Sequence, residues 1–371
     1  MDNLNIISFD IPYPANYGGV IDVFYKIKAL AALGTKVHLH CFEYGRKHAI
    51  ELETITESVH YYKRNLSRKL LLYRQPFIVL SRRDNNLIQR VLEEEYPVFM
   101  EGLHNTFLLS DERFSGRTKL VRTHNIEHEY YRNLAKIEDK RYRKLFYNSE
   151  ASKLAKYEPI LDRADEILTI SERDHTYFQR NYSNVSLVPA FHPFENVDIQ
   201  KGTGKYALYH GNLSVSENEN VASYLVQEVF AVLKLPLVIA GLNPSNQLKR
   251  LVAEYKNVTL IRNPSEQEML QLIQEAQILL NIASQTAGVK IKLLHSLFNG
   301  RHVIANRKMV QGSGLDELCR LANTTEQIIH AIHDLEDKPI SNDIRDRRQK
   351  VLDEKYNNRN NARKIQILAF Q

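Results

Sequence analysis

Residues 278–305 read ILLNIASQTAGVKIKLLHSLFNGRHVIA. An apolar run typical of a buried strand leads through a small polar loop to Gly288, an amphipathic helix, a stop at Gly300 and a second apolar strand. A helix that starts just after a strand presents free N–H groups and the positive end of its dipole to an anion. Because Lys290 and Lys292 add charge there, the segment predicts a phosphate site.

The helical period indicates which of the two lysines is better placed to bind a phosphate. At about 100° per residue, Gly288, Lys292 and His295 share one face, whereas Lys290 lies about 200° from Lys292. We therefore expect Lys292 to be the main phosphate ligand, with Lys290 contributing if it precedes the first full turn. The alternative is that both lysines are solvated surface groups.

Short apolar runs alternate with helical periods along the whole chain, which is typical of α/β folds with parallel sheets. Strands are expected near Asn5–Phe9, Lys36–Phe42, Ser58–Tyr62, Tyr96–Met100, Lys119–Thr123, Glu166–Ile170, Ser186–Val188, Tyr206–His210, Leu237–Ala240, Val258–Ile261, Ile278–Asn281 and His302–Ala305. A long basic helix is expected over much of Glu127–Arg163.

The alternation stops once and then restarts, which predicts two domains. Residues 1–190 form a first Rossmann-like domain, 191–204 a Pro- and Gly-containing linker, 205–341 a second Rossmann-like domain and 342–371 C-terminal helices rich in Arg and Lys. Two such domains would face a central cleft, with ligands bound beyond the carboxyl ends of the strands.

Composition excludes several classes of protein. The 371 residues are 43% hydrophobic and 25% charged, as in soluble globular proteins, and no window approaches the roughly 18 apolar residues of a membrane span. The start, MDNLNIISFDIP, reads as a first strand and not as a signal peptide. A net charge of +6 is too diffuse to indicate nucleic acid. Cys41 and Cys319 are expected to be buried and reduced, with a disulfide as the alternative.

A glycine pair follows the first strand. Gly18 and Gly19 precede an apolar helix that ends at Gly34. Paired glycines at a strand-to-helix turn let the backbone approach a ligand closely. The alternative for this segment is a plain tight turn.

The segment His124-Asn-Ile-Glu-His128 matches the H-x-x-E-H pattern of inverted zinc peptidases. Zinc binding would require both histidines on one helix face. Because TKLVRTH reads as a strand ending at His124, with Asn125 as a helix N-cap, we expect no metal here. His124 is then either a polar contact to substrate or a structural histidine.

The second domain opens with YALYHGNLSVSENENVASYL, which places Gly211 and Asn212 at a strand-to-helix turn before a helix capped near Ser216. Glu217 and Glu219 favour that helix N-terminus by their charge. Elsewhere, the stretch Arg64–Arg83, read as helical, and the long basic helix could touch anionic lipid headgroups. A solvated cationic face is the alternative for both.

Five segments together resemble the retaining GT-B glycosyltransferases, a group with many bacterial mannosyl- and glucosyltransferases of surface polysaccharide assembly. They are YGGV, THNIE at 123–127, YHGNLSVSEN, AGLNP at 240–244 and GVKIKLLHSLFNG at 288–300. The resemblance implies that the second domain holds a nucleotide-sugar and the first an acceptor. It also implies that the last helix crosses back to the first domain and that no metal or other cofactor is required.

The resemblance assigns roles to single residues. Gly18 and Gly19 match the glycines near the diphosphate, His124 the histidine that contacts the transferred sugar, and Lys292 the lysine of the nucleotide-sugar helix. The implied donor-binding residues also include Gly211, Asn212, Arg262, Gly288, Lys290 and His295.

Two departures concern the donor. His295 stands where the family has a glutamate on the ribose, and Asn212 and Glu217 stand where an arginine and a lysine often hold the diphosphate. A neutral imidazole can still bond a ribose hydroxyl.

The sequence thus predicts a cytoplasmic hexosyltransferase. It would move a hexose from a UDP- or GDP-linked donor to a glycan or lipid-linked acceptor with retention. Peripheral contact with the cytoplasmic face of the inner membrane, and no contact with nucleic acid, complete the prediction. The alternatives are a degenerate GT-B subunit that binds a sugar nucleotide or scaffolds a partner, and a sugar-nucleotide epimerase on the same fold.

Overall fold

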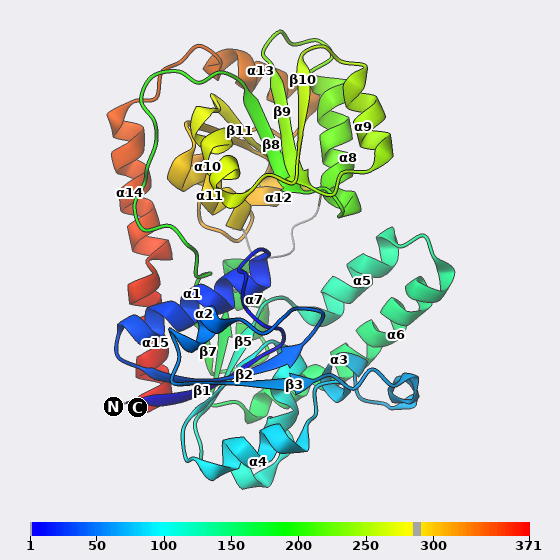
Figure 1. Cartoon of the computed structure of the whole chain (residues 1–371), viewed down its shortest axis with the longest axis vertical. Coiled ribbons are helices and arrows are strands. Elements are labelled where there is room, and N and C mark those ends of the chain that lie inside the picture. Colours follow the sequence, from blue (N-terminus) through cyan, green and yellow to red (C-terminus); the bar gives the residue numbers. More distant parts are fainter. Residues whose placement is uncertain (1, 285–290) are drawn as a thin grey trace. The chain divides into compact units, whose positions relative to one another are not determined.

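A computed structural model describes residues 2–284 and 291–371 (Figure 1). The chain forms two compact units. The first contains the residues up to Pro193 together with Tyr356–Gln371, and the second contains the rest of the described chain from Phe194 to Lys355. The first boundary lies inside the segment read as a linker.

The first unit is built on a seven-stranded parallel sheet of order β3-β2-β1-β4-β5-β6-β7. Its strands are β1 (Asn3–Ser8), β2 (Lys36–Glu43), β3 (Ser58–Lys63), β4 (Val98–Glu101), β5 (Lys119–Thr123), β6 (Glu166–Thr169) and β7 (Val185–Leu187). Side chains of successive residues point to opposite faces, so Ile6 packs into one apolar layer and Ile7 into the other. Helices cover both faces of this sheet.

The helices of the first unit are α1 (Gly18–Ala32), α2 (Ile50–Glu53), α3 (Phe77–Leu80), α4 (Asn85–Glu93), α5 (Glu127–Ile137), α6 (Arg141–Tyr157), α7 (Glu172–Gln179) and α15 (Asn358–Phe370), with 3₁₀ segments at Arg68–Leu72, Leu103–Ser110, Glu112–Phe114 and Glu158–Arg163. The C-terminal helix α15 packs beside α1 (Figure 1). Ala362, Ile365 and Ala369 of α15 are buried in the apolar layer that also contains Val23 and Ile27 of α1.

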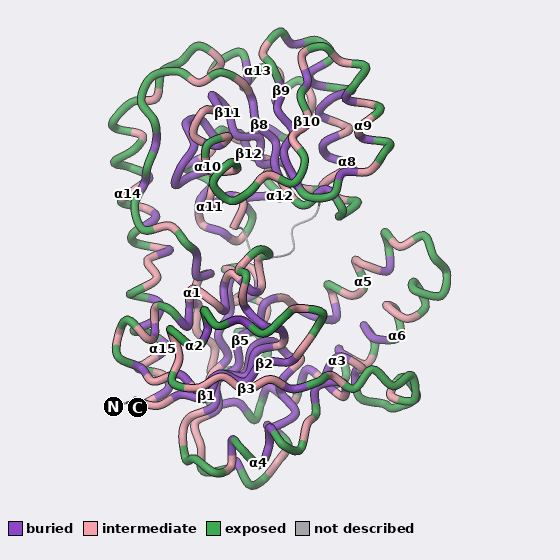
Figure 2. The backbone as a smooth tube through the Cα atoms, viewed as in Figure 1, coloured by how far each residue is buried: buried purple, intermediate pink, exposed green. Residues whose placement is uncertain are grey.

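The second unit repeats the plan with a six-stranded parallel sheet of order β10-β9-β8-β11-β12-β13. Its strands are β8 (Ala207–Asn212), β9 (Leu237–Leu242), β10 (Val258–Arg262), β11 (Ile278–Asn281), β12 (His302–Ala305) and β13 (Arg320–Leu321). Its helices are α8 (Ser216–Tyr224), α9 (Asn246–Ala253), α10 (Glu266–Glu275), α11 (Ile291–Asn299), α12 (Arg307–Val310), α13 (Thr325–Leu335) and α14 (Asn342–Tyr356), with a π-helical turn at Leu225–Val229 and a 3₁₀ turn at Asp316–Leu318. Figure 2 shows the strands of both sheets buried and the outer helix faces exposed.

The structure confirms all twelve predicted strands to within two residues at each end, and it adds the two-residue strand β13. The predicted stops at Gly34 and Gly300 are also confirmed, because α1 ends at Ala32 and α11 at Asn299. Both cysteines are free; Cys41 is buried as expected, whereas Cys319 is only half-buried. Among the described helices, none is long and apolar enough to cross a membrane.

Three helix predictions were wrong. The long basic helix is divided into α5, α6 and a 3₁₀ segment, because Glu138 is extended and turns the chain back so that α6 packs on α5. The stretch Arg64–Arg83 is mostly loop with two short helical segments, because Pro76 forces its neighbour out of the helical region. Gly18 and Gly19 are the first residues of α1 and not a turn before it.

Both sheets have the doubly wound order 3-2-1-4-5-6, with a seventh strand in the first. In such sheets the connections run in opposite directions from the two central strands, which opens a crevice at their carboxyl ends. The crevice positions are the ends of β1 and β4 in the first unit, and of β8 and β11 in the second. Most of the predicted site residues flank these two places.

The end of β8 requires a glycine on the neighbouring strand. A side-chain carbon added at Gly241 of β9 would lie 1.9 Å from the carbonyl oxygen of Gly211, its partner in the sheet register. We predict that Gly241→Ala lowers the free energy of unfolding by about 2 kcal/mol or more, because backbone must move to relieve the clash. Gly116→Ala, which adds its carbon into open space, should change it by less than about 0.5 kcal/mol. Urea denaturation measures both, and equal effects would contradict this description.

Candidate functional site

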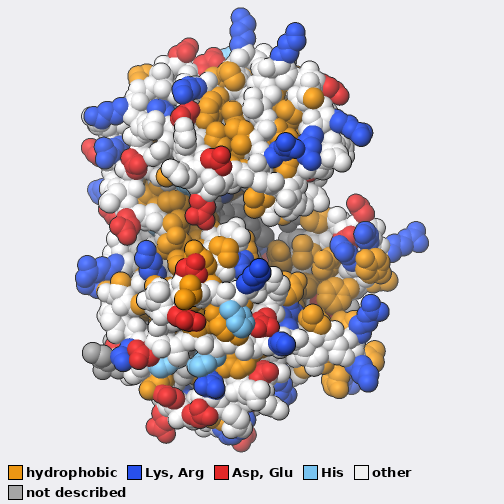
Figure 3. All heavy atoms as spheres, viewed as in Figure 1, with side chains coloured by type: hydrophobic (Ala, Val, Ile, Leu, Met, Phe, Trp, Pro, Cys, Tyr) orange, Lys and Arg blue, Asp and Glu red, His pale blue; other side chains and the backbone are white. Residues whose placement is uncertain are grey.

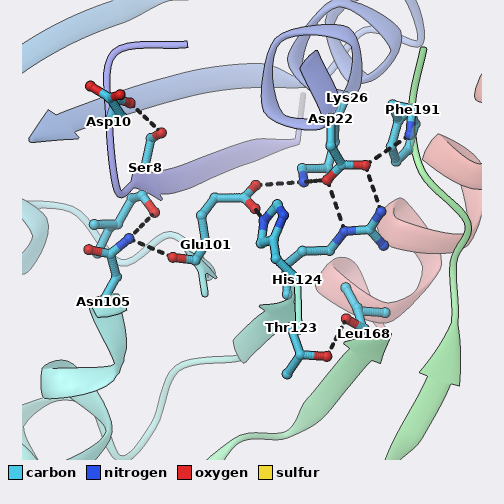
Figure 4. Close-up of polar contacts among 12 residues, drawn as sticks. Ser8, Asp10, Asp22, Lys26, Glu101, Asn105, Thr123, His124, Leu168 and Phe191 are labelled. Atoms are coloured by element: carbon cyan, nitrogen blue, oxygen red, sulfur yellow. Dashed lines mark hydrogen bonds and ion pairs between the residues drawn. The ribbon is translucent and has the colours of Figure 1, made fainter. Parts of the chain in front are cut away.

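The first candidate site is a chain of buried charges at the carboxyl end of the first sheet (Figure 4). It starts at Asp22 of α1, which is fully buried. Arg122 of β5 donates two hydrogen bonds to this carboxylate, one of 2.7 Å from Nη2 to Oδ1 and one of 3.1 Å from Nε to Oδ2. Oδ1 also accepts the backbone N–H of Phe191, at 2.8 Å. Burial alone would raise the pKa of Asp22, but Arg122 and Lys26 outweigh it and lower the pKa strongly.

The chain continues from Asp22 to a histidine. Nζ of Lys26, one helical turn along α1, lies 3.1 Å from Oδ2 of Asp22 and 2.6 Å from Oε1 of Glu101, the last residue of β4. Oε2 of Glu101 lies 2.9 Å from Nε2 of His124, which follows β5 directly. Burial opposes ionisation of Glu101, but Lys26 and His124 hold its pKa below the ordinary value.

Charge balance defines the hydrogen bonds that His124 can offer. Two cations, Lys26 and Arg122, face two carboxylates, Asp22 and Glu101, so the network is neutral when His124 is neutral. A neutral His124 donates from Nε2 to the carboxylate and carries a lone pair on Nδ1. Nδ1 is buried and has no hydrogen-bond partner among the described residues. In the tautomer that donates from Nε2 to Glu101, Nδ1 can therefore accept a hydrogen bond, as from a hydroxyl.

Gly19 and His124 both pack against the ring of Phe9. The Phe9 and His124 rings meet edge to face, with centroids 5.2 Å apart. A side-chain carbon at Gly19 would lie 2.9 Å from Cζ of Phe9. The glycine therefore allows the start of α1 to pack on Phe9, next to Gly18. Gly19 therefore has a packing role in addition to the ligand contact predicted for it.

The second histidine of HNIEH points elsewhere. Nδ1 of His128 lies 3.2 Å from Oε2 of Glu158, far from the Glu101 pair of His124. The N-cap of α5 is Ile126 with no side-chain bond, so the predicted capping by Asn125 was wrong. The Asn125 side chain instead bonds the carboxylate of Glu127, the first residue of α5.

One trio of possible metal ligands occurs in the described part of the chain, and it is Asp22, Glu101 and His124. Lys26 already lies between the two carboxylates of this trio, with its Nζ within 3.1 Å of each. A metal ion would have to displace that ammonium group. The chemistry of the donor set therefore fits a lysine better than a metal.

Glu127 is a second feature of this edge. Its side chain is buried, and Oε1 has no hydrogen-bond partner among the described residues. Burial raises the pKa of Glu127 to about 7, against the lowering effects of the Asn125 bond and the Arg82 charge. The sequence analysis did not single out this glutamate.

The candidate site of the second unit centres on Lys292 in α11. Its Nζ lies 3.8 Å from the centre of the Tyr209 ring and has no hydrogen-bond partner in the described part of the chain. Burial lowers the pKa of Lys292 to about 7, while the charge of Glu217 raises it slightly. Burying the protonated form of an amine costs free energy unless an anion lies beside it. The predicted phosphate ligand thus has no hydrogen-bond partner among residues 2–284 and 291–371.

His295 lies one turn after Lys292, in an aromatic setting. Its ring stacks on Phe194 with centroids 4.8 Å apart and meets His210 of β8 edge to face at 6.0 Å. Burial lowers the pKa of His295 to about 4, so the imidazole is neutral at pH 7. Nε2 of His210 is buried and also lacks a hydrogen-bond partner among the described residues. The lysine and the two neutral rings therefore lie close together in the second unit.

Side chains of helix α8 and strand β8 form hydrogen bonds within the turns that follow β11 and β8. Oε1 of Glu217 in α8 accepts from the backbone N–H and the hydroxyl of Ser284, at 3.1 and 2.8 Å. Oδ1 of Asn212 accepts from the backbone and hydroxyl of Ser214, at 3.1 and 2.7 Å. Helix α8 starts at Ser216, and its N-cap residue, Val215, makes no side-chain capping hydrogen bond. In this structure Asn212 and Glu217 therefore shape the turns after β8 and β11.

Arg262, the exposed last residue of β10, pairs with Gly241, which in turn pairs with Gly211. Two strand spacings, about 10 Å, separate the Arg262 and Gly211 backbones. Gly288 and Lys290 lie outside the described residues. The structure therefore brings Lys292 and His295 together and leaves Arg262 at the edge of the sheet.

Comparison with known proteins places these two units in context. No protein-family model matches the chain. A curated protein of Klebsiella pneumoniae, described as an uncharacterized 44.6 kDa protein in the cps region, is 27% identical over 354 residues and 90% of each chain. Among solved structures, the lipopolysaccharide outer core galactosyltransferase WaaB is 15% identical with a TM-score of 0.62, covering 98% of this chain and 99% of its own.

Two further solved structures align over nearly their whole length. Anabaena HepE in complex with UDP and glucose covers 99% of both chains at 10% identity and a TM-score of 0.64. A variant of S. aureus TarM bound to UDP covers 100% of both chains at 11% identity and a TM-score of 0.65. The fold is GT-B. The two α/β sheets of the GT-B chain, each with its candidate residues at the carboxyl ends of the strands, agree with the fold class expected from the sequence.

The raised pKa of Glu127 has a consequence for stability in this GT-B protein. Because the folded carboxyl (pKa about 7) binds protons that the unfolded one (pKa about 4.3) releases, stability falls as pH rises through that window. We predict that Glu127→Gln leaves stability unchanged at pH 4.5 and raises it at pH 8, by on the order of 3 kcal/mol. Urea unfolding at the two pH values measures this. The exposed Glu254→Gln is the control, and a loss of stability in Glu127→Gln at pH 8 would contradict the assignment.

Proposed function

We propose that the chain transfers a hexose from a UDP- or GDP-linked sugar to a glycan or lipid-linked acceptor with retention at the anomeric carbon. Lys292 carries this proposal, because it is a buried amine without a partner among the described residues, near the carboxyl ends of β8 and β11. Such a group binds an anion well, since the anion supplies the missing charge. The GT-B fold supports the reaction class.

In the reaction, the bond between the anomeric carbon and the diphosphate oxygen breaks, and negative charge grows on the departing diphosphate. Lys292, protonated when the diphosphate is bound, would stabilise that charge in a site shielded from water. The aromatic contacts around Lys292 and His295 keep water away from them. The acceptor oxygen then bonds to the same carbon, and its proton passes to the departing diphosphate.

His124 of the first unit would contact the transferred sugar. Its Nδ1 accepts a hydrogen bond when Nε2 donates to Glu101, so a sugar hydroxyl is the group that it fits. Gly18 and Gly19 would allow the diphosphate to approach the start of α1. His295 would bond a ribose hydroxyl as a neutral imidazole, in place of the family's glutamate.

Three similar proteins support the broader role. HepE was solved with UDP and glucose and the TarM variant with UDP, and the Klebsiella relative comes from a cps region. On these grounds we propose a role in surface polysaccharide or glycoconjugate synthesis. We further propose that the chain works in the cytoplasm, peripheral to the membrane, with no cofactor or metal and no nucleic-acid partner.

A non-enzymatic GT-B subunit is the second candidate. Asn212 and Glu217 stand where the family often has cations, and both are engaged in local turns. Such a protein would bind a sugar nucleotide through Lys292 and catalyse no transfer.

The test combines binding, turnover and stability in one variant, Lys292→Met. We predict that it weakens UDP or GDP binding and slows sugar transfer by about 100-fold, because the phosphate loses its charged partner. We also predict higher stability than wild type at pH 6, since the buried ammonium is gone. Calorimetry with each nucleotide, release of nucleoside diphosphate from sugar donors and urea unfolding measure the three effects.

The exposed Lys256→Met controls for loss of one lysine. Unchanged nucleotide binding in Lys292→Met would overturn the proposed donor site. Nucleotide binding by wild type without turnover of any donor, in the presence of glycan and lipid-linked acceptors, would favour the non-enzymatic subunit.

A further inference from the structure

Two arginines of the first unit lie close together at the carboxyl edge of its sheet. Arg64 is half-buried and follows β3 directly, and its Nη2 donates to the hydroxyl of Ser81 at 2.9 Å. Arg82, the next residue after Ser81, is buried. Its Nε and Nη2 donate to the carbonyl oxygen of Phe9, directly after β1, at 3.2 and 3.1 Å. We call Arg64 and Arg82 the arginine pair.

The arginine pair lacks a full counter-charge. Neither arginine forms an ion pair with a carboxylate in the described part of the chain, and Nε of Arg64 is buried without a hydrogen-bond partner there. Burial, reinforced by the charge of Arg64, lowers the pKa of Arg82 to about 9. Two like charges held away from water cost free energy unless an anion lies beside them.

Two carboxyl groups act on the pair, and neither balances it fully. Asp10 attracts both arginines, but its carboxylate already accepts the hydroxyl of Tyr17 at 2.8 Å and the backbone N–H of Ile11 at 2.9 Å. Glu127 interacts with Arg82, but burial raises its pKa to about 7. About half of the Glu127 carboxyls are therefore neutral at pH 7. Part of the positive charge of the pair remains for a ligand.

Phe9 connects the arginine pair to the predicted sugar contact. Its carbonyl oxygen accepts from Arg82, and its ring lies 5.2 Å from the ring of His124 and 5.6 Å from the ring of His104, between centroids. Nδ1 of His104, like Nδ1 of His124, is buried with no hydrogen-bond partner among the described residues. A ligand group bound by the pair would therefore lie near the place where a sugar hydroxyl would meet His124.

The arginine pair differs from the cations of the surface. Figure 3 shows basic and acidic side chains interspersed over both units. Exposed cations also pair with exposed carboxylates, as Arg347 does with Glu317 at 2.6 Å. Such groups are solvated and require no ligand. Arg82 is shielded from water and unpaired among the described residues, so it is the kind of cation that an anion stabilises.

We infer that the arginine pair binds an anionic group of the acceptor, either a phosphate or a carboxylate. Guanidinium groups hold both anions through paired, charge-assisted hydrogen bonds. The phosphate would belong to a lipid-linked acceptor and the carboxylate to a uronic acid of a glycan. The anion belongs to the acceptor because the diphosphate of the donor has its own amine, Lys292. That assignment rests on the proposed function, whereas anion binding by the pair does not.

Calorimetry with three small probes tests the inference. The probes are methyl phosphate, methyl glucuronide and methyl glucoside; the last two differ at one carbon, where a carboxylate replaces a hydroxymethyl group. Each is titrated into the full chain carrying Lys292→Met, so that the donor amine does not contribute. Further proteins add Arg64→Gln, Arg64→Lys or, as the matched control, Arg83→Gln at the exposed neighbour of Arg82.

One or both anionic probes should bind about tenfold or more tightly than methyl glucoside, and the probe that binds identifies the kind of acceptor. Arg64→Gln should weaken anion binding by about tenfold or more. Arg64→Lys should lose less affinity because it keeps the charge, and Arg83→Gln should lose none. Thermal unfolding without ligand checks that each variant is folded. Equal binding of the three probes, or full anion binding by Arg64→Gln, would overturn the inference.

Nucleotide binding separates the arginine pair from the donor site. With Lys292 in place, Arg64→Gln should bind UDP and GDP as the wild type does. A loss of nucleotide affinity in Arg64→Gln would assign the pair to the donor and overturn the inference. Anion binding by the pair in a chain that transfers no sugar would support the anion site and contradict the proposed function, so the two claims fail separately.

Discussion

The candidate site of the first unit depends on the ion pair between Asp22 and Arg122. The pair joins helix α1 to strand β5, and Arg122 also donates to the carbonyl oxygens of Val188 and Pro189, where the chain leaves the sheet. Both side chains are fully buried. Removing one partner of a buried pair leaves an uncompensated charge, which costs several kcal/mol. The position of α1, and with it the orientation of Lys26, Glu101 and His124, follows from this pair.

The two units treat charge differently at equivalent places. In the first unit, every buried charge of the network has an opposite charge within about 3 Å, so only the Nδ1 atom of His124 offers a bond to an incoming group. In the second unit, Lys292 lies over the face of Tyr209, and among the described residues Glu217 is the attractive charge that affects it. A network whose charges are paired can offer a neutral hydrogen bond to a ligand. A buried amine without an opposite charge beside it instead favours the binding of an anion. This contrast fits a sugar at the first place and a diphosphate at the second.

Sequence periodicity was sufficient to predict both sheets, because parallel strands buried on both faces appear as plain apolar runs. It also identified Lys292 and His295, whose spacing of three residues places them on one helix side. The charged network was missed, since Arg122 and Asp22 are 100 residues apart and pair only in three dimensions. A signal was nevertheless present: Asp22 and Lys26 interrupt an apolar helix one turn apart.

The other incorrect predictions from the sequence have local structural causes. The HNIEH pattern suggests two neighbouring histidines, but the change from strand to helix turns His128 toward Glu158. The basic segments were read as continuous helices because lysine and arginine are good helix formers, yet Pro76 and the extended Glu138 interrupt them. The lowered pKa of Lys292 could not be predicted, because it comes from burial in the folded chain.

Proton uptake on nucleotide binding tests the central claim most directly. With a pKa of about 7, Lys292 is largely neutral in the free protein at pH 8 and must gain a proton when a diphosphate binds. Calorimetry of UDP or GDP binding at pH 8, in two buffers of different ionisation enthalpy, counts those protons. The account predicts uptake of about 0.9 proton per nucleotide bound. Tight binding with no proton uptake would contradict it.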